Sequence, residues 1–162
     1  MQVASKSVVV LVGLLALHSA TSTGQQLPPP NYDSDPRLQK LKSFFQELES
    51  PGVWRAEVFL AAADRNGLDW RLLPSISIIE SGGGRAYMNN NILGWDSCRT
   101  SFPSVEAGID LVAAQLSQST FYRDKDLDEK IAAYNPNSSY PRRVKSLMER
   151  LGPGLSSPYS PD

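Results

Sequence analysis

One carboxylate, Glu80, has neighbours that favour acid chemistry. It follows an isoleucine-rich run at 76–79 and directly precedes Ser81 and the three glycines 82–84. Apolar surroundings and the C-terminal end of a helix both disfavour the charged form of a carboxyl group. A carboxyl group that stays protonated near neutral pH can donate its proton to a departing oxygen. Glu80 is therefore a candidate general acid, and the glycines would let backbone approach a ligand closely. The alternative is a solvated glutamate at a helix end.

Histidine and cysteine chemistry is largely excluded. The 162 residues include one histidine, His18, and one cysteine, Cys98. His18 lies in a segment that we expect to be removed, and its loss excludes Ser-His-Asp and Cys-His nucleophilic machinery and histidine-ligated zinc. A lone cysteine cannot form an internal disulfide, so we expect Cys98 to be a free, partly buried thiol, the alternative being a disulfide with another molecule. No metal-ligand cluster or phosphate-binding loop is visible, and we predict neither metal nor cofactor.

The charge balance bears on the partners. Sixteen basic and 17 acidic residues give a formal net charge of −1. A protein that binds nucleic acid usually has a basic patch or stripe, and none is visible here. We therefore expect no nucleic-acid partner.

The first 22 residues are typical of a secretory signal peptide. Lys6 precedes an apolar run at 8–17, and small residues follow at 20–22. A run of about ten apolar residues is short of the roughly 20 that span a bilayer. We expect a secreted or periplasmic protein with no stable membrane span after cleavage, the alternative being an uncleaved N-terminal anchor.

Proline and serine mark the limits of the folded part. Residues 23–35 contain three consecutive prolines and predict an extended polar linker without a core of its own. Residues 153–162 predict a flexible Ser/Pro tail. Between them, residues 36–152 are long enough for one domain, which we expect to be a monomer.

Hydrophobic periodicity predicts about six helices in this domain. Asp35 is a predicted N-cap for a helix that starts at Pro36, and a second helix covers about 54–65. Pro74 is expected to mark the regular start of a third helix, which ends near Glu80. Later helices are predicted after Ser104, after the capping-box pair Asp126 and Glu129, and from Pro141. The expected core positions of the third and last helices are Leu72, Leu73, Ile76, Ile79, Val144, Leu147, Met148 and Leu151. From Gly82 to Pro103 the periodicity is lost, which predicts a loop or a small irregular hairpin.

Several motifs occur in an order that resembles the lysozyme-like glycosidases. The set comprises Glu80-Ser81-Gly82-Gly83-Gly84-Arg85, Asn91-Ile92-Leu93-Gly94-Trp95, Phe102 before a helix, and the tyrosines Tyr122, Tyr134 and Tyr140. It is most similar to the bacterial endo-β-N-acetylglucosaminidases, with lytic transglycosylases as near relatives. The resemblance covers about residues 54–151. It implies a mostly α fold of the α+β lysozyme-like class, with a cleft between two helical lobes that binds peptidoglycan or a related amino-sugar glycan.

The resemblance also implies roles for individual residues. Glu80 would protonate the leaving oxygen of a β-1,4 glycosidic bond, with Tyr134 across the cleft near the developing positive charge. Ser81 would support the region of Glu80. The residues implied in substrate binding are Ser81, Asn91, Trp95, Asp96 and Asn135. Alternatively, Tyr134 and Trp95 are aromatic residues of the core, and the asparagine run at 89–91 only supplies turn conformations.

Two features depart from a simple two-carboxylate glycosidase. Asp96 is the only acidic residue between Gly82 and Pro103, and so it is the candidate second carboxylate. In the resembled families a group of the substrate can take that second role, and the residues leave open whether the product is hydrolysed or forms an anhydro sugar. Gly83 replaces the aromatic residue of the family pattern, which changes the expected fit of one subsite. The alternatives are a non-catalytic peptidoglycan-binding module on the same fold and a purely structural secreted helical domain.

Overall fold

The computed structural model describes residues 31–154. The predicted signal peptide (1–22), linker residues 23–30 and tail residues 155–162 lie outside the described residues. The described part contains the helices α1 (Pro36–Glu47), α2 (Ala56–Arg65), α3 (Leu72–Ser81), α4 (Val105–Gln118), α5 (Leu127–Tyr134) and α6 (Tyr140–Leu151), with 3₁₀ turns η1 (Pro51–Arg55) and η2 (Trp95–Cys98). The mostly helical class is confirmed. No β-strand occurs within residues 31–154, so the hairpin alternative for the insertion is wrong.

Three helix starts follow directly from capping chemistry. The Asp35 side chain accepts a hydrogen bond from the backbone N–H of Arg37, with Pro36 at the first helical position of α1. Ser104 accepts from the N–H of Ala107 at the start of α4. Asp126 and Glu129 form the predicted capping box at α5.

Two predicted starts are corrected. Helix α3 begins at Leu72, two residues before Pro74, and not at the proline. A proline is tolerated there because the N–H groups of the first turn have no acceptor within the helix. Residues 51–55 form the 3₁₀ turn η1, and α2 therefore begins at Ala56 and not at Trp54.

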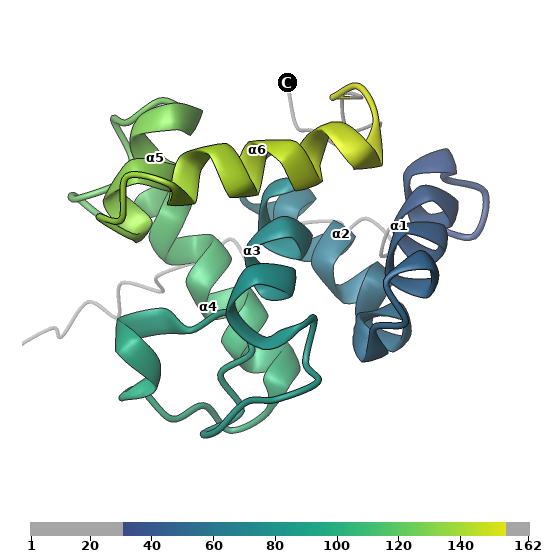
Figure 1. Cartoon of the computed structure of the whole chain (residues 1–162), viewed down its shortest axis with the longest axis horizontal. Coiled ribbons are helices and arrows are strands. Elements are labelled where there is room, and N and C mark those ends of the chain that lie inside the picture. Colours follow the sequence, from purple (N-terminus) through teal and green to yellow (C-terminus); the bar gives the residue numbers. More distant parts are fainter. Residues whose placement is uncertain (1–30, 155–162) are drawn as a thin grey trace, which may run out of the picture.

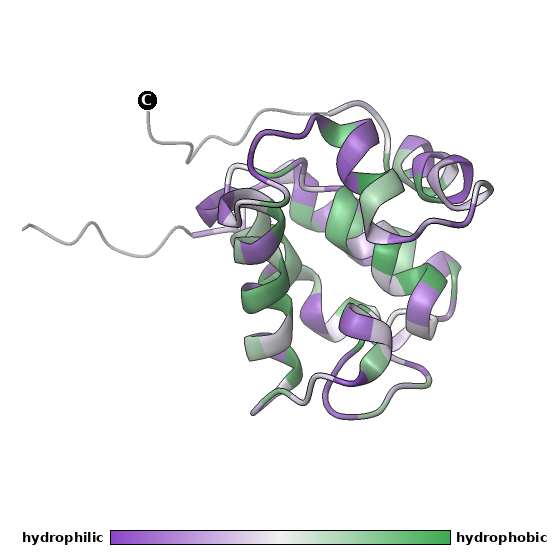
Figure 2. Cartoon of the chain, turned by 90° about the vertical axis from the view of Figure 1, so that its left-hand side faces the viewer, coloured by the Kyte–Doolittle hydropathy of each residue, from purple (hydrophilic) through white to green (hydrophobic). Residues whose placement is uncertain are grey.

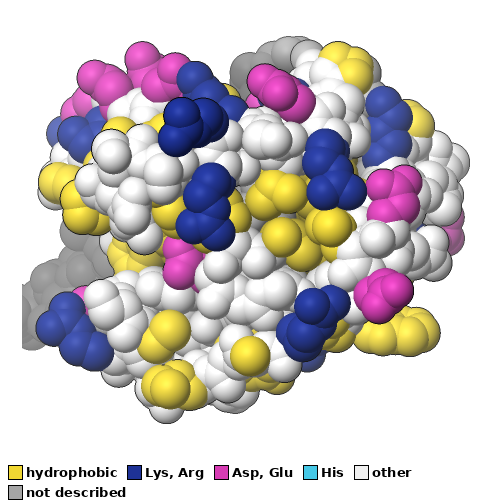
Figure 3. Space-filling view, in the orientation of Figure 1, with side chains coloured by type: hydrophobic (Ala, Val, Ile, Leu, Met, Phe, Trp, Pro, Cys, Tyr) yellow, Lys and Arg dark blue, Asp and Glu magenta, His cyan; other side chains and the backbone are white. Residues whose placement is uncertain are grey.

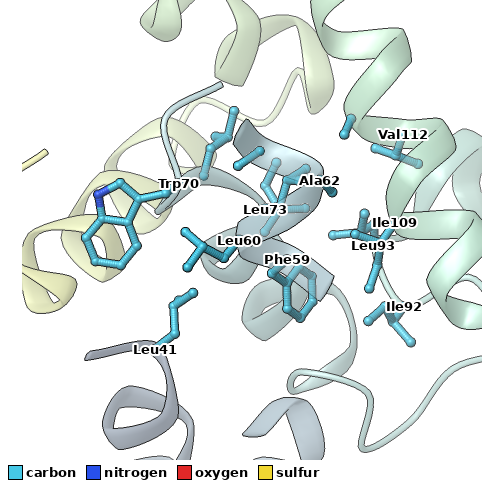
Figure 4. Close-up of a cluster of buried hydrophobic side chains, with 14 of the residues drawn as sticks. Leu41, Phe59, Leu60, Ala62, Trp70, Leu73, Ile92, Leu93, Ile109 and Val112 are labelled. Atoms are coloured by element: carbon cyan, nitrogen blue, oxygen red, sulfur yellow. The ribbon is translucent and has the colours of Figure 1, made fainter. Parts of the chain in front are cut away.

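Helix α3 lies at the centre of the domain (Figure 1), with α6 packed across it and with α2 on its other side. The apolar faces of the helices point inward (Figure 2). Figure 4 shows the resulting core, in which Leu60 of α2 and Leu73 of α3 lie between Trp70 and Phe59. The insertion contributes Ile92 and Leu93, each about 1% exposed. These two residues anchor the irregular segment to the helical core.

The described end of the predicted linker belongs to the folded domain, which corrects the boundary at residue 35. Tyr32 is 3% exposed, and its hydroxyl donates to the Asp64 carboxylate at 3.1 Å. Arg37 is also buried, and its guanidinium pairs with Asp35 at 2.7 Å and with Asp64 at 2.8 Å. This buried ion cluster ties the start of α1 to α2. One guanidinium thus serves two carboxylates, which leaves a formal charge of −1 in the cluster, and the Tyr32 hydroxyl supplies a further hydrogen bond to Asp64.

Some positions predicted for the core are only half-buried. Ile79 of α3 and Leu147 of α6 belong to this group because they face a surface hollow between the two helices. Within residues 31–154, no helix has the length and apolarity needed to cross a membrane.

Candidate functional site

A pocket of about 600 Å³ opens between the insertion and the end of α5. Glu80 enters it from the C-terminal end of α3. The lining residues are Glu80, Gly94, Trp95, Asp96, Ser97, Thr100, Tyr122, Tyr134, Asn135 and Pro136. Five of the seven residues named from the sequence therefore line one pocket, although they are up to 55 positions apart in the chain (135 − 80).

Glu80 is placed by the way in which α3 ends. Gly82 takes a left-handed φ of +64° and closes the helix directly after Glu80 and Ser81. On the opposite side the carboxylate packs against the backbone of Gly94. A methyl group on Gly94 would lie 2.6 Å from Glu80 Oε2, and Gly94 itself has a φ of +69°. Only glycine combines this backbone conformation with this approach.

Within residues 31–154, no ion pair includes the Glu80 carboxylate, and so no basic side chain neutralises it. The half-buried group therefore faces the pocket without a cationic partner. Its oxygens are therefore available to a ligand in the pocket.

Aromatic rings form one wall of the pocket. Trp95 lies 5.8 Å from Tyr134 and 6.1 Å from Tyr122, measured between ring centroids. The Tyr134 hydroxyl donates to the backbone carbonyl of Leu93 at 2.6 Å, which joins α5 to the insertion. Burial, and then the negative charge of Glu80, raise the pKa of Tyr134 well above its ordinary value. Tyr134 is therefore a neutral hydrogen-bond donor at any pH near neutrality.

Tyr140 stands behind this wall. Its ring stacks on Tyr134 with centroids 6.2 Å apart and planes within 12°. Its hydroxyl is buried and makes no hydrogen bond of normal geometry within residues 31–154. Burial and then the Glu80 carboxylate raise the pKa of this hydroxyl strongly. The Tyr140 hydroxyl is thus a protonated group beside the candidate acid.

Ser81 and Asn91 do not line the pocket, although the sequence placed them among the substrate-binding residues. Asn91 is 1% exposed; its amide nitrogen donates to the carbonyls of Trp95 at 2.8 Å and Thr100 at 3.2 Å, and its oxygen accepts from the Trp95 N–H. Ser81 Oγ donates to the carbonyl of Ile92 at 2.7 Å and accepts from the N–H of Gly84. Both side chains thus hold the backbone that carries the pocket residues.

Asp96 lies on the exposed rim of the pocket. Its carboxylate forms an ion pair with Arg99 and accepts a long hydrogen bond of 3.4 Å from Thr100. Asp96 and the next two residues, Ser97 and Cys98, all have left-handed φ angles between +51° and +61°. Cys98 is a free, half-buried thiol, as predicted. The candidate second carboxylate is therefore partly neutralised, unlike Glu80.

Gly83 is a structural requirement of this fold. It has a φ of +70°, and a methyl group on it would lie 2.0 Å from Ser50 Oγ. Ser50 donates to the carbonyl of Gly82 at 2.9 Å, so that the end of α3 packs tightly on the start of η1. No side chain of any size fits at this position.

The sequence gives no significant match to known protein families or to curated proteins. Within residues 31–154 no group of three or more His, Cys, Asp or Glu side chains is arranged to hold a metal ion.

Six residues of the site were not named as site residues from the sequence. The pocket lining includes Gly94, Ser97, Thr100, Tyr122 and Pro136, and Tyr140 lies behind the aromatic wall. Gly94, Tyr122 and Tyr140 belong to the family-like motif set, but nothing in the residue types alone distinguishes a glycine that touches a carboxylate from one in an ordinary turn.

Proposed function

We propose that this protein is an exported glycan-cleaving enzyme with a lysozyme-like fold, acting on β-1,4 bonds of peptidoglycan with Glu80 as general acid. The observation that carries the proposal is the Glu80 carboxylate, unpaired by any cation of the described residues, in a pocket walled by Trp95, Tyr122 and Tyr134. Aromatic faces are suitable surfaces for packing sugar rings, and a carboxyl group beside them can reach a glycosidic oxygen.

In this mechanism the Glu80 carboxyl group gives its proton to the oxygen of the leaving sugar as the glycosidic bond breaks. Positive charge then develops on the ring that remains in the pocket. The ionised Glu80 carboxylate would stabilise that charge at short range. Tyr134, whose hydroxyl is held by the Leu93 carbonyl, would fix the wall against which the ring lies.

The group that completes the reaction is proposed to come from the substrate. Asp96 is the only other acidic residue of the pocket lining, and its ion pair with Arg99 reduces its value as a nucleophile or base. The N-acetyl oxygen or the 6-hydroxyl group of an amino sugar can take this role. The first would lead to hydrolysis and the second to an anhydro sugar.

The ion pair between Asp96 and Arg99 also favours one alternative function. A pocket with a single free carboxylate could hold a glycan without cutting it, as a non-catalytic peptidoglycan-binding module. A binding module needs the aromatic wall but has no need for an acidic Glu80.

The deciding experiment is mass spectrometry of soluble products after incubation of the mature protein with peptidoglycan. Glu80→Gln keeps the size of the side chain and removes the acid, so we expect products from the native protein and none from this variant. Glu57→Gln, an exposed position on α2, is the matched control and should remain active. Reducing GlcNAc ends would indicate a glucosaminidase, reducing MurNAc ends a muramidase, and anhydro-MurNAc ends a lytic transglycosylase.

Loss of activity in Glu80→Gln must occur with the fold retained, which far-ultraviolet circular dichroism and thermal unfolding would check. If the native protein sediments with peptidoglycan but releases nothing, the binding module becomes the better account. Undiminished cleavage by Glu80→Gln would contradict the assignment of the acid.

A further inference from the structure

A second hollow, of about 440 Å³, lies on the surface between α3 and α6. Its lining residues are Ile78, Ile79, Arg142, Arg143, Ser146 and Leu147. Figure 3 shows apolar side chains gathered below α6 on this face, with basic side chains beside them. The hollow combines an apolar floor with positive charge and has no acidic residue in its lining.

Two residues of the apolar floor, Ile79 and Leu147, stand at positions that the sequence predicted for the core. Ile78, Ile79 and Leu147 pack against the core on one side and remain half-exposed on the other. A contiguous apolar surface rimmed by polar groups is the usual mark of a binding surface. The packing of α3 on α6 therefore leaves this surface available to a ligand.

The basic rim is unusual within this molecule. Of the arginines in residues 31–154, Arg142 and Arg143 alone have a side chain with neither an ion pair nor a hydrogen bond to another described group. The others pair with carboxylates or, like Arg85, donate to backbone carbonyls. Two adjacent guanidinium groups without a protein partner are available for an anionic ligand, and the fork of a guanidinium matches a carboxylate in a bidentate manner.

The hollow and the candidate active site are lined from neighbouring positions of α3, since Ile79 of the floor immediately precedes Glu80. On α6, the charge of Arg143 acts on the Tyr140 hydroxyl, the same group on which the Glu80 carboxylate acts.

We infer that this hollow binds the carboxylate-bearing peptide substituent of the glycan, and this inference rests on the proposed function. The peptide that branches from peptidoglycan carries both aliphatic side chains and free carboxylates. Its aliphatic groups would cover Ile78, Ile79 and Leu147, and its carboxylates would pair with Arg142 and Arg143. The hollow would then make the protein selective for peptide-bearing strands over bare strands, which lack the peptide's aliphatic groups and carboxylates.

The binding test uses isotope-labelled Glu80→Gln protein, which cannot turn its ligand over. One probe is a disaccharide that carries a tetrapeptide, and the other is a peptide-free chito-oligosaccharide. We expect the peptide-bearing probe to shift the methyl resonances of Ile78, Ile79 and Leu147. The peptide-free probe should shift only residues of the first pocket, such as Trp95 and Tyr134.

The variant test replaces both free arginines, as Arg142→Gln with Arg143→Gln. We expect affinity for the peptide-bearing probe to fall by about tenfold or more, because charge-assisted hydrogen bonds are lost, and affinity for the chito-oligosaccharide to stay unchanged. Arg65→Gln is the matched control, since Arg65 is an exposed arginine that lines neither hollow and already pairs with Asp110.

The outcomes separate the two proposals. Shifts confined to the first pocket with both probes, or equal affinities in the double variant, would overturn the peptide site while leaving glycan cleavage intact. Methyl shifts at the hollow in a protein that releases no products would support the peptide site and remove the enzyme proposal. If neither probe binds anywhere, both proposals are overturned.

Discussion

The Tyr134 hydroxyl donates a hydrogen bond of 2.6 Å to the backbone carbonyl of Leu93, and this bond joins the two sides of the pocket. Tyr134 is the last residue of α5, whereas Leu93 is anchored in the core from the insertion. Gly94 and Trp95 follow Leu93 directly and face Glu80 and Tyr134. One bond therefore sets the spacing between the aromatic wall and the segment that packs on the candidate acid.

Removing that hydroxyl should loosen the pocket. We expect Tyr134→Phe to lower the free energy of unfolding by about 1–2 kcal/mol, because the buried Leu93 carbonyl loses its partner. Glycan cleavage should fall more than stability explains, since the wall is no longer fixed. Urea unfolding and product release measure the two effects, with Tyr87→Phe, at a 45% exposed position, as control. Unchanged activity in Tyr134→Phe would contradict the positioning role.

Gly94 offers a sharper test of the placement of Glu80. Gly94→Ala puts a methyl group 2.6 Å from Glu80 Oε2 and also forces a left-handed conformation on alanine. Gly67→Ala imposes similar backbone strain, at a φ of +59°, but its methyl group would meet nothing within 4 Å. We expect both variants to lose about 1–2 kcal/mol of stability from backbone strain. Only Gly94→Ala should also lose activity, because its methyl group displaces the carboxylate.

Equal activity in these two glycine variants would contradict close packing of Glu80 on Gly94. The carboxylate itself can be followed by carbon NMR of labelled glutamate. The chemical shift of the Glu80 carboxyl carbon should change in Gly94→Ala and stay the same in Gly67→Ala.

The sequence predicted helix ends where one side chain decides the local structure. Asp35 and the Asp126–Glu129 pair cap their helices as predicted, because each satisfies nearby backbone N–H groups. Ser104, after which a helix was predicted, caps α4 in the same way. The start of α3 was predicted wrongly because a proline in a first turn and a proline that begins a helix look the same in sequence. Distinguishing them requires the packing of Leu72 and Leu73 in the core.

The candidate site could be predicted in residue types but not in roles. Glu80, Trp95 and Tyr134 were named from the sequence, and they line one pocket. Asn91 was named for binding a ligand, yet its amide is fully used by the backbone of Trp95 and Thr100. An asparagine can bind either a ligand or a loop, and only its burial distinguishes the two.

The buried ion cluster should be a main source of stability for the N-terminal part of the domain. Arg37→Met would leave Asp35 and Asp64 buried without their cation, and we expect a loss of about 3–5 kcal/mol. Arg65→Met removes the exposed pair with Asp110 on the neighbouring surface and should cost less than about 1 kcal/mol. Urea unfolding at neutral pH would compare them, and equal losses would contradict the importance of the cluster.

Acid should weaken the same cluster. Burial alone would raise the pKa of Asp35, but hydrogen bonds from Arg37 outweigh burial and lower it below the ordinary value of 3.8. In the unfolded chain Asp35 takes up a proton near pH 3.8, while the folded protein resists until a lower pH. The contribution of ionised Asp35 to the free energy of unfolding is therefore complete above the ordinary pKa of 3.8 and is lost as the pH falls through the lowered pKa of the folded protein. The decline in unfolding free energy below pH 4 should be shallower in Asp35→Asn than in the native protein, and equal slopes would contradict the pairing.

Alkaline pH should weaken the aromatic side of the pocket. Burial and the nearby Glu80 carboxylate raise the pKa of Tyr140 strongly, so the folded protein keeps this phenol protonated while the unfolded chain releases its proton near pH 10. Stability from this residue is therefore present below pH 10 and is lost as the pH rises above it. In Tyr140→Phe the decline in the free energy of unfolding above pH 10 should be shallower than in the native protein.

At neutral pH the Tyr140→Phe substitution should cost little stability, because the buried hydroxyl has no hydrogen bond of normal geometry to lose within the described residues. Thermal unfolding from pH 7 to pH 11 would measure both effects, and a neutral-pH loss above about 2 kcal/mol would mean that the hydroxyl is firmly bonded to Glu80.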